Sequence, residues 1–430
     1  MDMMFVVGMV LFMVFFFGGA PIWLALVVGA TVAGVFSAGM TPTTVPLTLL
    51  TGLDSFLLLA LPFFILGGNI MAKTGPGDYF FKTFDAWLGR LPAGLPISTI
   101  ATCMAFGAVT GSALADLVAV GNMAVPSLTA RGYPKKFTLA LLCCSGTLGQ
   151  IIPPSGYMIM YAAFTGTNVA TLFAAGFIPG IIVGLFLMGS AFIQCKRGAY
   201  GTGSSAWSWK ERWVATLQGI PALGMIAIIL GGIYSGFFTP TEAAAVAAVY
   251  GLLIAKFVYR KINWPIFKSV VIESARTVSF IGFLIAAAVL FAVPLAYNEI
   301  PQNVTRWLIQ MQVGKTGLMF MVVGLWLVMG CFLDPSAIIV LTLPIIYPSL
   351  VAFKIDLTHF CVVCVVCMQI GLITPPFGLS LYATSSIWKE PMPGIIKHCI
   401  PFLAAMIATL PILVFFPQLS LWLPGLFGLR

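Results

Sequence analysis

Hydrophobic residues fill long blocks of this chain, and short polar or basic stretches separate the blocks. Residues 5–20, 21–40 and 55–72, for example, contain no charged side chain. A helix of about 20 apolar residues crosses the hydrocarbon core of a bilayer, about 30 Å thick, and it satisfies its own backbone hydrogen bonds there. The pattern therefore predicts an all-α polytopic membrane protein. Outer-membrane barrels use short alternating segments, which these uniform blocks do not resemble.

Composition supports a lipid environment. Of 430 residues, 60% are hydrophobic and only 8% are charged, which is too little polar surface for a soluble globular protein. No basic region precedes the first apolar block, so we expect that block to remain as a membrane span and not to be cleaved as a signal peptide. The nine cysteines lie within apolar blocks without metal-finger spacing, which is typical of small buried side chains.

The net charge of +9 reflects basic residues that lie between the apolar blocks. Basic residues beside membrane spans usually mark the cytoplasmic side, and we therefore expect no nucleic-acid partner. If these loops are cytoplasmic, only Arg306, Lys315 and Lys354 lie clearly outside, as the positive-inside rule requires. We expect a multi-pass protein of the bacterial inner membrane. The cytoplasmic basic groups are predicted at 73–90, 131–136, 196–212, 256–268 and 389–397.

With these loops inside, the chain forms one transporter domain, 1–430, with a first half at 1–197, a cytoplasmic linker at 198–212 and a second half at 213–430. Segments 95–130 and 317–353 each begin and end on one side of the membrane, which predicts two re-entrant hairpins. Lipid tolerates such hairpins only where protein or water covers their turns. Full spans are predicted at 4–19, 20–40, 55–73, 137–166, 169–194, 214–236, 240–258, 270–297, 358–388 and 397–424.

The two halves resemble each other at an offset of 222 residues, which places 111–156 over 333–378. Identical positions include Pro126-Ser127-Leu128 with Pro348-Ser349-Leu350, and Pro153-Pro154 with Pro375-Pro376. The first copy approaches from the cytoplasm and the second from outside, so the repeat is inverted. Inverted repeats that place a hairpin and a broken helix in each half are typical of secondary transporters.

The double prolines predict the two broken helices. Proline has no backbone donor and clashes with the carbonyl four residues earlier, so neither Pro153-Pro154 nor Pro375-Pro376 can lie inside a regular helix. The freed carbonyls and the C-terminal half-helix ends favour a small cation, whereas N-terminal half-helix ends favour an anion. A simple kink relieved by neighbouring helices is the structural alternative, which two matching breaks disfavour.

The hairpin turns bring polar groups into apolar segments. The first contains Gly111, Ser112 and Asp116, and the second contains Asp334 and Ser336. An ionisable group inside a membrane segment is costly and by default indicates function, and oxygen ligands suit a hard cation such as Na⁺. Alternatively, each Asp caps a short helix.

Two further polar clusters are interpreted as helix starts. Thr239-Pro240-Thr241-Glu242 has the residues of a capping box, in which Thr239 and Glu242 bond each other's backbone. Asp54-Ser55 before Phe56 is interpreted in the same way.

Taken together, these segments resemble the large membrane subunit of tripartite ATP-independent periplasmic (TRAP) transporters, the DctM-like family. The resemblance covers nearly the whole chain. It is carried by Thr51–Phe56, Leu61–Leu66, Gly111–Asp116, Ile151–Ser155, Leu172–Gly176, Gly231–Gly236, Phe238–Ala243, Phe332–Pro335 and Ile370–Gly378.

The resemblance implies an elevator-type transporter, in which a mobile domain that holds both hairpins carries substrate past a scaffold. It also implies an inward Na⁺ gradient as the driving force, a small DctQ-like membrane subunit and a periplasmic DctP-like binding protein. Family substrates are mostly organic acids, including C4-dicarboxylates and sialic acids. No cofactor and no enzymatic activity are expected.

Candidate site residues follow from the turns and breaks together with the resemblance. The cation-binding candidates are Gly111, Ser112, Gly149, Asp334, Ser336, Gly371 and Thr374. The substrate-binding candidates are Asp116, Gln150, Ser155, Gln369 and Ser380.

Four positions, in three segments, depart from the usual family pattern. Cys367 and Gln369 stand where Asn and Glu are frequent. Gln150 replaces a usual Pro, and Ser380 stands where Asn is frequent. A soft thiol is a poor ligand for a hard cation, so main-chain carbonyls near Gly371 are expected to serve the second cation site.

Three other functions compete with this interpretation. A membrane hydrolase would need an activated nucleophile or a metal site, but His359 and His398 have no partner at metal-ligand spacing. A channel would typically use a symmetric filter. A stand-alone ion-coupled carrier or antiporter of the same architecture is the main alternative.

Overall fold

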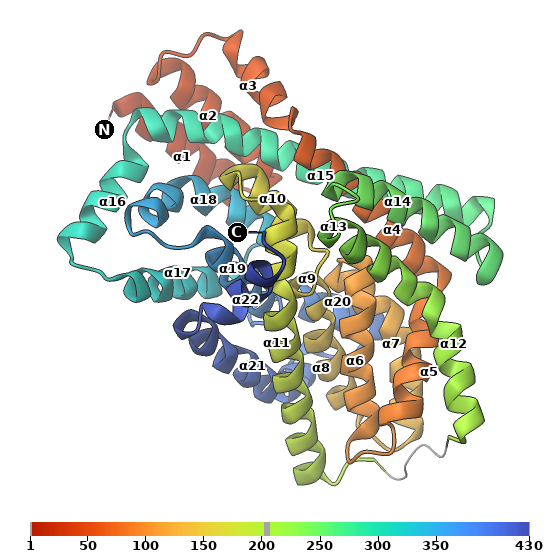
Figure 1. Cartoon of the computed structure of the whole chain (residues 1–430). Coiled ribbons are helices and arrows are strands. Elements are labelled where there is room, and N and C mark those ends of the chain that lie inside the picture. Colours follow the sequence, from red (N-terminus) through yellow and green to blue (C-terminus); the bar gives the residue numbers. More distant parts are fainter. Residues whose placement is uncertain (1, 202–206, 430) are drawn as a thin grey trace.

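The computed structural model describes residues 2–201 and 207–429, which form helices joined by short connections (Figure 1). The helices of the first half are α1 (Met3–Phe17), α2 (Ile22–Phe36), α3 (Thr44–Leu53), η1 (Phe56–Leu59), α4 (Ala60–Thr74), α5 (Pro76–Leu88), α6 (Gly94–Thr110), α7 (Ala113–Ala130), α8 (Lys135–Gly146), α9 (Leu148–Ile151), α10 (Gly156–Thr165) and α11 (Val169–Gly198). Those of the second half are α12 (Trp209–Ile226), η2 (Ala227–Gly231), α13 (Gly232–Tyr234), α14 (Pro240–Leu253), η3 (Ile254–Val258), α15 (Trp264–Tyr297), α16 (Ile300–Gln310), α17 (Lys315–Gly330), α18 (Pro335–Ala352), α19 (Leu357–Gly371), α20 (Leu379–Trp388), α21 (Met392–Phe415) and α22 (Gln418–Leu426).

The internal repeat is clearer in the helices than in the sequence. The predicted offset of 222 residues carries α7, Ala113–Ala130, onto α18, Pro335–Ala352, end for end. It also carries the start of α8 at Lys135 onto the start of α19 at Leu357. Each half thus contains a helical hairpin, α6–α7 or α17–α18, followed by an interrupted helix, α8–α10 or α19–α20, and a long helix, α11 or α21.

The two interrupted helices run in opposite directions, as an inverted repeat requires. At one end, Lys135 at the start of α8 donates to the Trp388 carbonyl at the end of α20 (3.2 Å) and pairs with Glu390 (3.4 Å). Towards the other end, the Tyr161 hydroxyl of α10 donates to the carbonyl of Leu357 at the start of α19 (2.9 Å). The start of each interrupted helix therefore lies beside the later part of the other.

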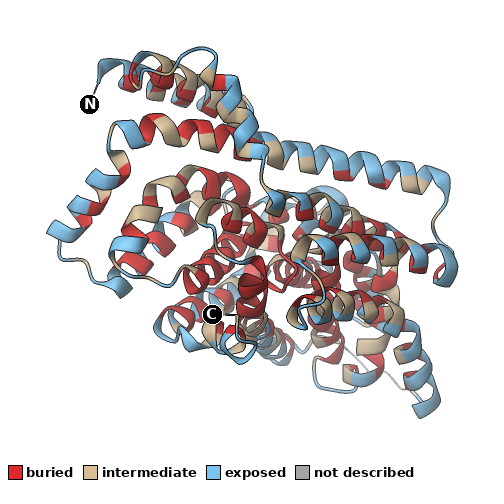
Figure 2. Cartoon of the chain, turned by 45° about the horizontal axis from the view of Figure 1, so that its top comes forward, coloured by how far each residue is buried: buried red, intermediate tan, exposed pale blue. Residues whose placement is uncertain are grey.

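The interrupted helices also form the centre of the protein. From Phe137 to Gly146 in α8, and from Thr358 to Gly371 in α19, every residue is buried. Figure 2 shows buried residues concentrated on the central helices, with exposed residues on the outlying ones. A helix that is apolar and buried on every side belongs to the interior of a bundle, so α8 and α19 are shielded from lipid by their neighbours.

The predicted spans and hairpins largely match the observed helices. Within residues 2–201 and 207–429, eight helices have the length and apolar composition to cross a membrane, and the bent pair α8–α9 with α10 makes up to nine. The prediction was wrong in detail at two spans, because α15 begins at Trp264, not 270, and the last span is interrupted between α21 and α22. Three short helices, α3, α5 and α16, were not predicted.

The linker predicted at 198–212 is shorter than expected. Gly198 still belongs to α11, and α12 begins at Trp209 with Ser208 as its cap. Residues 202–206 of this linker lie outside the described residues.

Of the two predicted helix caps, one is confirmed. The Thr239 amide donates to the Glu242 carboxylate (2.8 Å), and the Glu242 amide donates to the Thr239 hydroxyl (3.3 Å), which forms the capping box of α14. At Asp54-Ser55 a helix begins at Phe56 as predicted, but the predicted side-chain cap does not form. Asp54 ends α3, and Ser55 precedes the short helix η1 without a side-chain bond to it.

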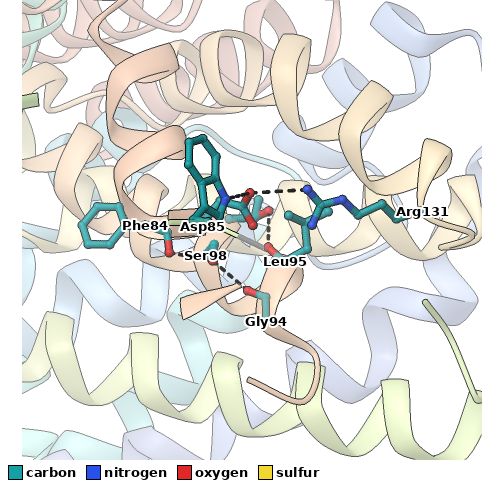
Figure 3. A network of polar contacts seen from close by, with 8 residues as sticks. Phe84, Asp85, Gly94, Leu95, Ser98 and Arg131 are labelled. Carbon is teal, nitrogen blue, oxygen red and sulfur yellow. Dashed lines mark hydrogen bonds and ion pairs between the residues drawn. The ribbon is translucent and has the colours of Figure 1, made fainter. Parts of the chain in front are cut away.

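A buried carboxylate fastens the base of the first hairpin (Figure 3). Asp85 of α5 is 4% exposed and lies 3.5 Å from the guanidinium of Arg131, which ends α7. The Trp207 indole also donates to Asp85 (3.1 Å), and the Ser98 hydroxyl of α6 donates to the Phe84 carbonyl of α5 (3.1 Å). The amphipathic helix α5 thus holds both arms of the hairpin at the end opposite the turn.

The cysteines behave as predicted. All nine are free, and eight of them are buried.

Close packing of α17 on α19 generates a stability prediction. A Cβ on Gly330 would lie 2.7 Å from the Gly371 Cα, whereas a Cβ on Gly324, in the same helix, would meet nothing within 4 Å. We expect Gly330→Ala to lower the free energy of unfolding by about 1–3 kcal/mol, the usual range for overpacking. Gly324→Ala should be neutral or slightly stabilising, because alanine favours helix. Thermal unfolding of both variants in detergent tests this, and equal melting temperatures would contradict the packing.

Candidate functional site

A cavity of about 720 Å³ lies where the two hairpin turns meet helices α4 and α15. The turn of the first hairpin contributes Gly111 and Ser112, and the second contributes Asp334 and Ser336. The two breaks contribute Gln150 and Ser380. Four segments that are far apart in the sequence therefore reach one space, as the inverted-repeat prediction requires.

The first turn is built by glycine and serine. Gly111 has a φ of +60°, in the left-handed region that favours glycine, and it ends α6. Ser112 caps α7, its hydroxyl accepting from the Ala115 amide (3.4 Å). A Cβ on Gly111 would lie 2.7 Å from the Pro154 carbonyl oxygen, so the turn sits directly on the break of the first interrupted helix.

Asp116 lies behind this turn and does not line the cavity. Its side chain is fully buried and accepts a 2.5 Å hydrogen bond from the Thr110 hydroxyl. Its second carboxylate oxygen has no hydrogen-bond partner among the described residues and points between Gly107 and Gly149, where a side chain would collide with it. The idea that Asp116 caps α7 was wrong, because Ser112 occupies that position.

Asp334 forms the helix cap that was one of its two predicted roles, and it also lies at the cavity. It caps α18, accepting from the Ser336 amide (2.9 Å) and from the Ser336 hydroxyl. Both residues also line the cavity. The cap therefore orients a carboxylate and a hydroxyl at the end of the second turn.

The two breaks expose backbone groups beside the turns. The first interrupted helix bends by 41° between Ile151 and Gly156, and the second is open from Leu372 to Gly378. A Cβ on Gly378 would lie 3.0 Å from the carbonyl oxygens of both Leu372 and Thr374, so carbonyls crowd this point. The Thr374 hydroxyl donates to the Ile370 carbonyl (2.7 Å) at the start of the second break.

The remaining predicted residues lie behind the cavity wall. Ser155 and Gln369 are fully buried, and the Ser155 hydroxyl and both polar atoms of the Gln369 amide lack hydrogen-bond partners among the described residues. Buried polar groups are normally paired, so these two mark a polar shell around the breaks. Gly149 faces Asp116, and Gly371 packs on Gly330. Cys367 is buried against the Val323 carbonyl (3.3 Å), one turn before Gly371.

The sequence analysis missed the opposite wall of the cavity. Lys73 of α4 pairs with Glu273 of α15 at 2.6 Å, and the Asn69 amide donates to the Ser274 hydroxyl (2.9 Å). Lys73 and Glu273 both line the cavity. Glu273 lies in the predicted span 270–297, where Arg276 is the one other charged residue. The rule that an ionisable residue in a membrane segment indicates function would have drawn attention to it.

The fold and the cavity define a multi-pass membrane transporter of the inverted-repeat class. A family model described as "Tripartite ATP-independent periplasmic transporter, DctM component" matches residues 9–419, so the chain belongs to the DctM family of TRAP large permeases. The protein is therefore a permease of the inner membrane, and the hydrolase interpretation is excluded.

Individual relatives agree with the family match. The chain is 38% identical to the C4-dicarboxylate TRAP transporter large permease DctM of Pseudomonas aeruginosa, over 87% of this chain and 88% of that one. It is 30% identical to the sialic acid TRAP transporter large permease SiaM of Vibrio cholerae, over 96% of each chain. Among solved structures, the YdaH transporter of Alcanivorax borkumensis shares the fold with a TM-score of 0.64 at 13% identity, over 97% of this chain and 99% of that one.

The buried Thr110–Asp116 bond generates a prediction for the first half-site. Thr110→Val removes the hydroxyl that donates to the fully buried Asp116 carboxylate, which should cost about 1–3 kcal/mol of unfolding free energy. Thr102→Val is the matched control, because the Thr102 hydroxyl bonds a carbonyl of its own helix (2.7 Å). Thermal unfolding of the pair checks this, and equal losses would show that Asp116 does not need the bond.

Proposed function

We propose that this chain is the membrane subunit that performs Na⁺-coupled uptake of an organic acid, delivered by a periplasmic binding protein. The observation that supports this most is the meeting of both hairpin turns and both helix breaks at one cavity. Such a cavity at a repeat interface is where secondary transporters hold substrate and coupling ion.

Charge supports cation coupling. Among the described residues that line the cavity, Lys73 carries the one positive charge, and Asp334 and Glu273 carry two negative charges. A carboxylate substrate would add to this negative excess in a region of low dielectric, where repulsion is strong. Cations that enter with the substrate would offset the repulsion, which favours symport over simple anion passage.

The available ligands suit Na⁺. The hydroxyls of Ser112 and Ser336, the Asp334 carboxylate and the carbonyls freed at the two breaks form an all-oxygen set, the kind that hard cations prefer. The carbonyls of Gly111, Gly149, Gly371 and Thr374 complete the proposed cation sites. Gln150 and Ser380 face the cavity and are assigned to the substrate, with Asp116, Ser155 and Gln369 supporting them from behind.

Packing supports an elevator. Helices α1, α2, α4, α14 and α15 pack on one another, whereas α8, α11, α19 and α21 surround the breaks. The cavity between these groups extends to Lys73 at the end of α4 and to Ile266 near the start of α15. Both adjoin loops that the positive-inside rule places in the cytoplasm. The structure therefore corresponds to an inward-open state in this proposal.

The proposed partners are a small DctQ-like membrane subunit and a DctP-like periplasmic binding protein, with a carboxylate such as a C4-dicarboxylate or sugar acid as substrate. Reconstitution of the chain with its small subunit in liposomes separates this from a stand-alone carrier. Uptake should require the binding protein and an inward Na⁺ gradient. Uptake without the binding protein would instead support the carrier.

The cation assignment predicts a change in Na⁺ dependence. Ser112→Ala and Asp334→Asn should each raise the Na⁺ concentration for half-maximal uptake about tenfold or more, the effect of losing one charge-assisted oxygen contact. Ser235→Ala is the control, because that hydroxyl bonds the Gly232 carbonyl outside the cavity (3.2 Å). Unchanged Na⁺ activation in both cavity variants would remove these residues from the proposed sites.

The charge of the cavity predicts a separate effect on the substrate. Lys73→Gln should raise the substrate KM about tenfold by removing the one cation that faces an incoming carboxylate, while the Na⁺ requirement persists. Lys82→Gln, at an exposed position of α5 outside the cavity, is the control. An unchanged KM in the Lys73 variant would show that backbone and hydroxyl groups alone hold the carboxylate.

A further inference from the structure

A second hollow lies between the long helices α11 and α21, away from the transport cavity. Its volume is about 740 Å³. The apolar part is formed by Phe186, Gly189 and Ile193 of α11 with Pro401 and Ala404 of α21. Gly189 leaves this part open, because a Cβ there would meet nothing within 4 Å. We call this hollow the α11–α21 groove.

One end of the groove is polar and basic. Ser190, Gln194 and Arg197 follow one another along the face of α11, and the Gln194 amide donates to the Ser190 hydroxyl (3.3 Å). Arg197 is exposed and forms no ion pair within the described part of the chain. On α21, Lys397 precedes Pro401 by one turn and therefore lies on the same face at this end.

The polarity of the groove matches one leaflet of a bilayer. From Phe186 to Arg197 a helix rises about 16 Å at about 1.5 Å per residue, close to half of a hydrocarbon core of about 30 Å. Arg197 and Lys397 belong to two of the basic groups placed in the cytoplasm by the positive-inside rule. The basic end thus lies at head-group level and the apolar end points to the middle of the membrane.

We infer that the groove binds one anionic phospholipid of the cytoplasmic leaflet. The Arg197 guanidinium holds the phosphate, because its planar fork bonds phosphate oxygens in pairs. Gln194 and Lys397 support the head group, and an acyl chain lies over Gly189. Basic hollows between membrane helices on the cytoplasmic side are suited to anionic head groups. The apolar part of the groove alone would accept a zwitterionic lipid equally well. The positive charges of Arg197 and Lys397 favour an anionic lipid.

The head-group contact is tested by native mass spectrometry of the full chain from vesicles of phosphatidylcholine with phosphatidylglycerol. The wild type should retain phosphatidylglycerol preferentially, and Arg197→Gln should reduce that retention about tenfold, the effect of losing a charged hydrogen-bond pair. Lys268→Gln removes an exposed charge on α15, outside the groove, and should leave retention unchanged. Equal losses in the two variants would overturn the site in favour of diffuse surface charge.

A second pair of matched variants tests the contact between the groove and the acyl chain. Gly189→Leu fills the groove, and Gly324→Leu places the same side chain at another exposed helical glycine with open space around it. Only the first should lower lipid retention, with melting temperatures of both near that of the wild type. Retention that persists in Gly189→Leu, retention of phosphatidylcholine as strong as that of phosphatidylglycerol, or displacement of the lipid by a co-purified protein subunit would each overturn the inference.

Discussion

Backbone polar groups in the middle of a membrane need partners. In each half of this fold, the hairpin packs against the broken helix. A hairpin turn or a broken helix alone would leave amides and carbonyls in hydrocarbon, at a cost of several kcal/mol for each group. Here Gly111 of the first turn lies on the Pro154 carbonyl of the first break. In the second half, α17 of the hairpin packs on α19 through Gly330 and Gly371. Each half therefore covers its break with its own hairpin.

This mutual covering explains why α8 from Phe137 and α19 from Thr358 are buried to their C-terminal ends. The breaks must lie deep enough to exclude lipid, yet open enough to admit a hydrated ligand. Glycine meets both needs, because it permits close backbone approach at Gly107 and Gly149, where the Asp116 carboxylate occupies the space of a side chain. Among the described residues, Asp116, Gln150, Ser155 and Gln369 lie near the breaks, and each has a buried side-chain polar atom without a hydrogen-bond partner. The fold thus tolerates several unpaired polar groups around the cavity.

Much of this arrangement could be predicted from the sequence, because apolar block length and paired prolines are strong local signals. Hydropathy identified the long spans, and the offset repeat identified α7 with α18. The amphipathic helices α5 and α16 were not predicted, since their polar faces resemble loops in a hydropathy pattern. The ion pair between Lys73 and Glu273, which we call the scaffold pair, was not predicted for another reason. Its partners are 200 residues apart, and nothing local shows that α4 and α15 share a cavity with the turns.

That scaffold pair changes how the site should be understood. Lys73 and Glu273 are each more than one-third exposed, so their ion pair is screened and contributes little stability. A weak pair exchanges partners readily, so in the proposed function Lys73 would turn from Glu273 to a carboxylate substrate at small cost. The turns and breaks, by contrast, are fixed by capping and close packing at Ser112 and Asp334. In the proposed function, a rigid wall of turns and breaks would hold the ion, and an adaptable wall at Lys73 and Glu273 would accept varied acids. Such a division agrees with relatives of one family that are named for different substrates.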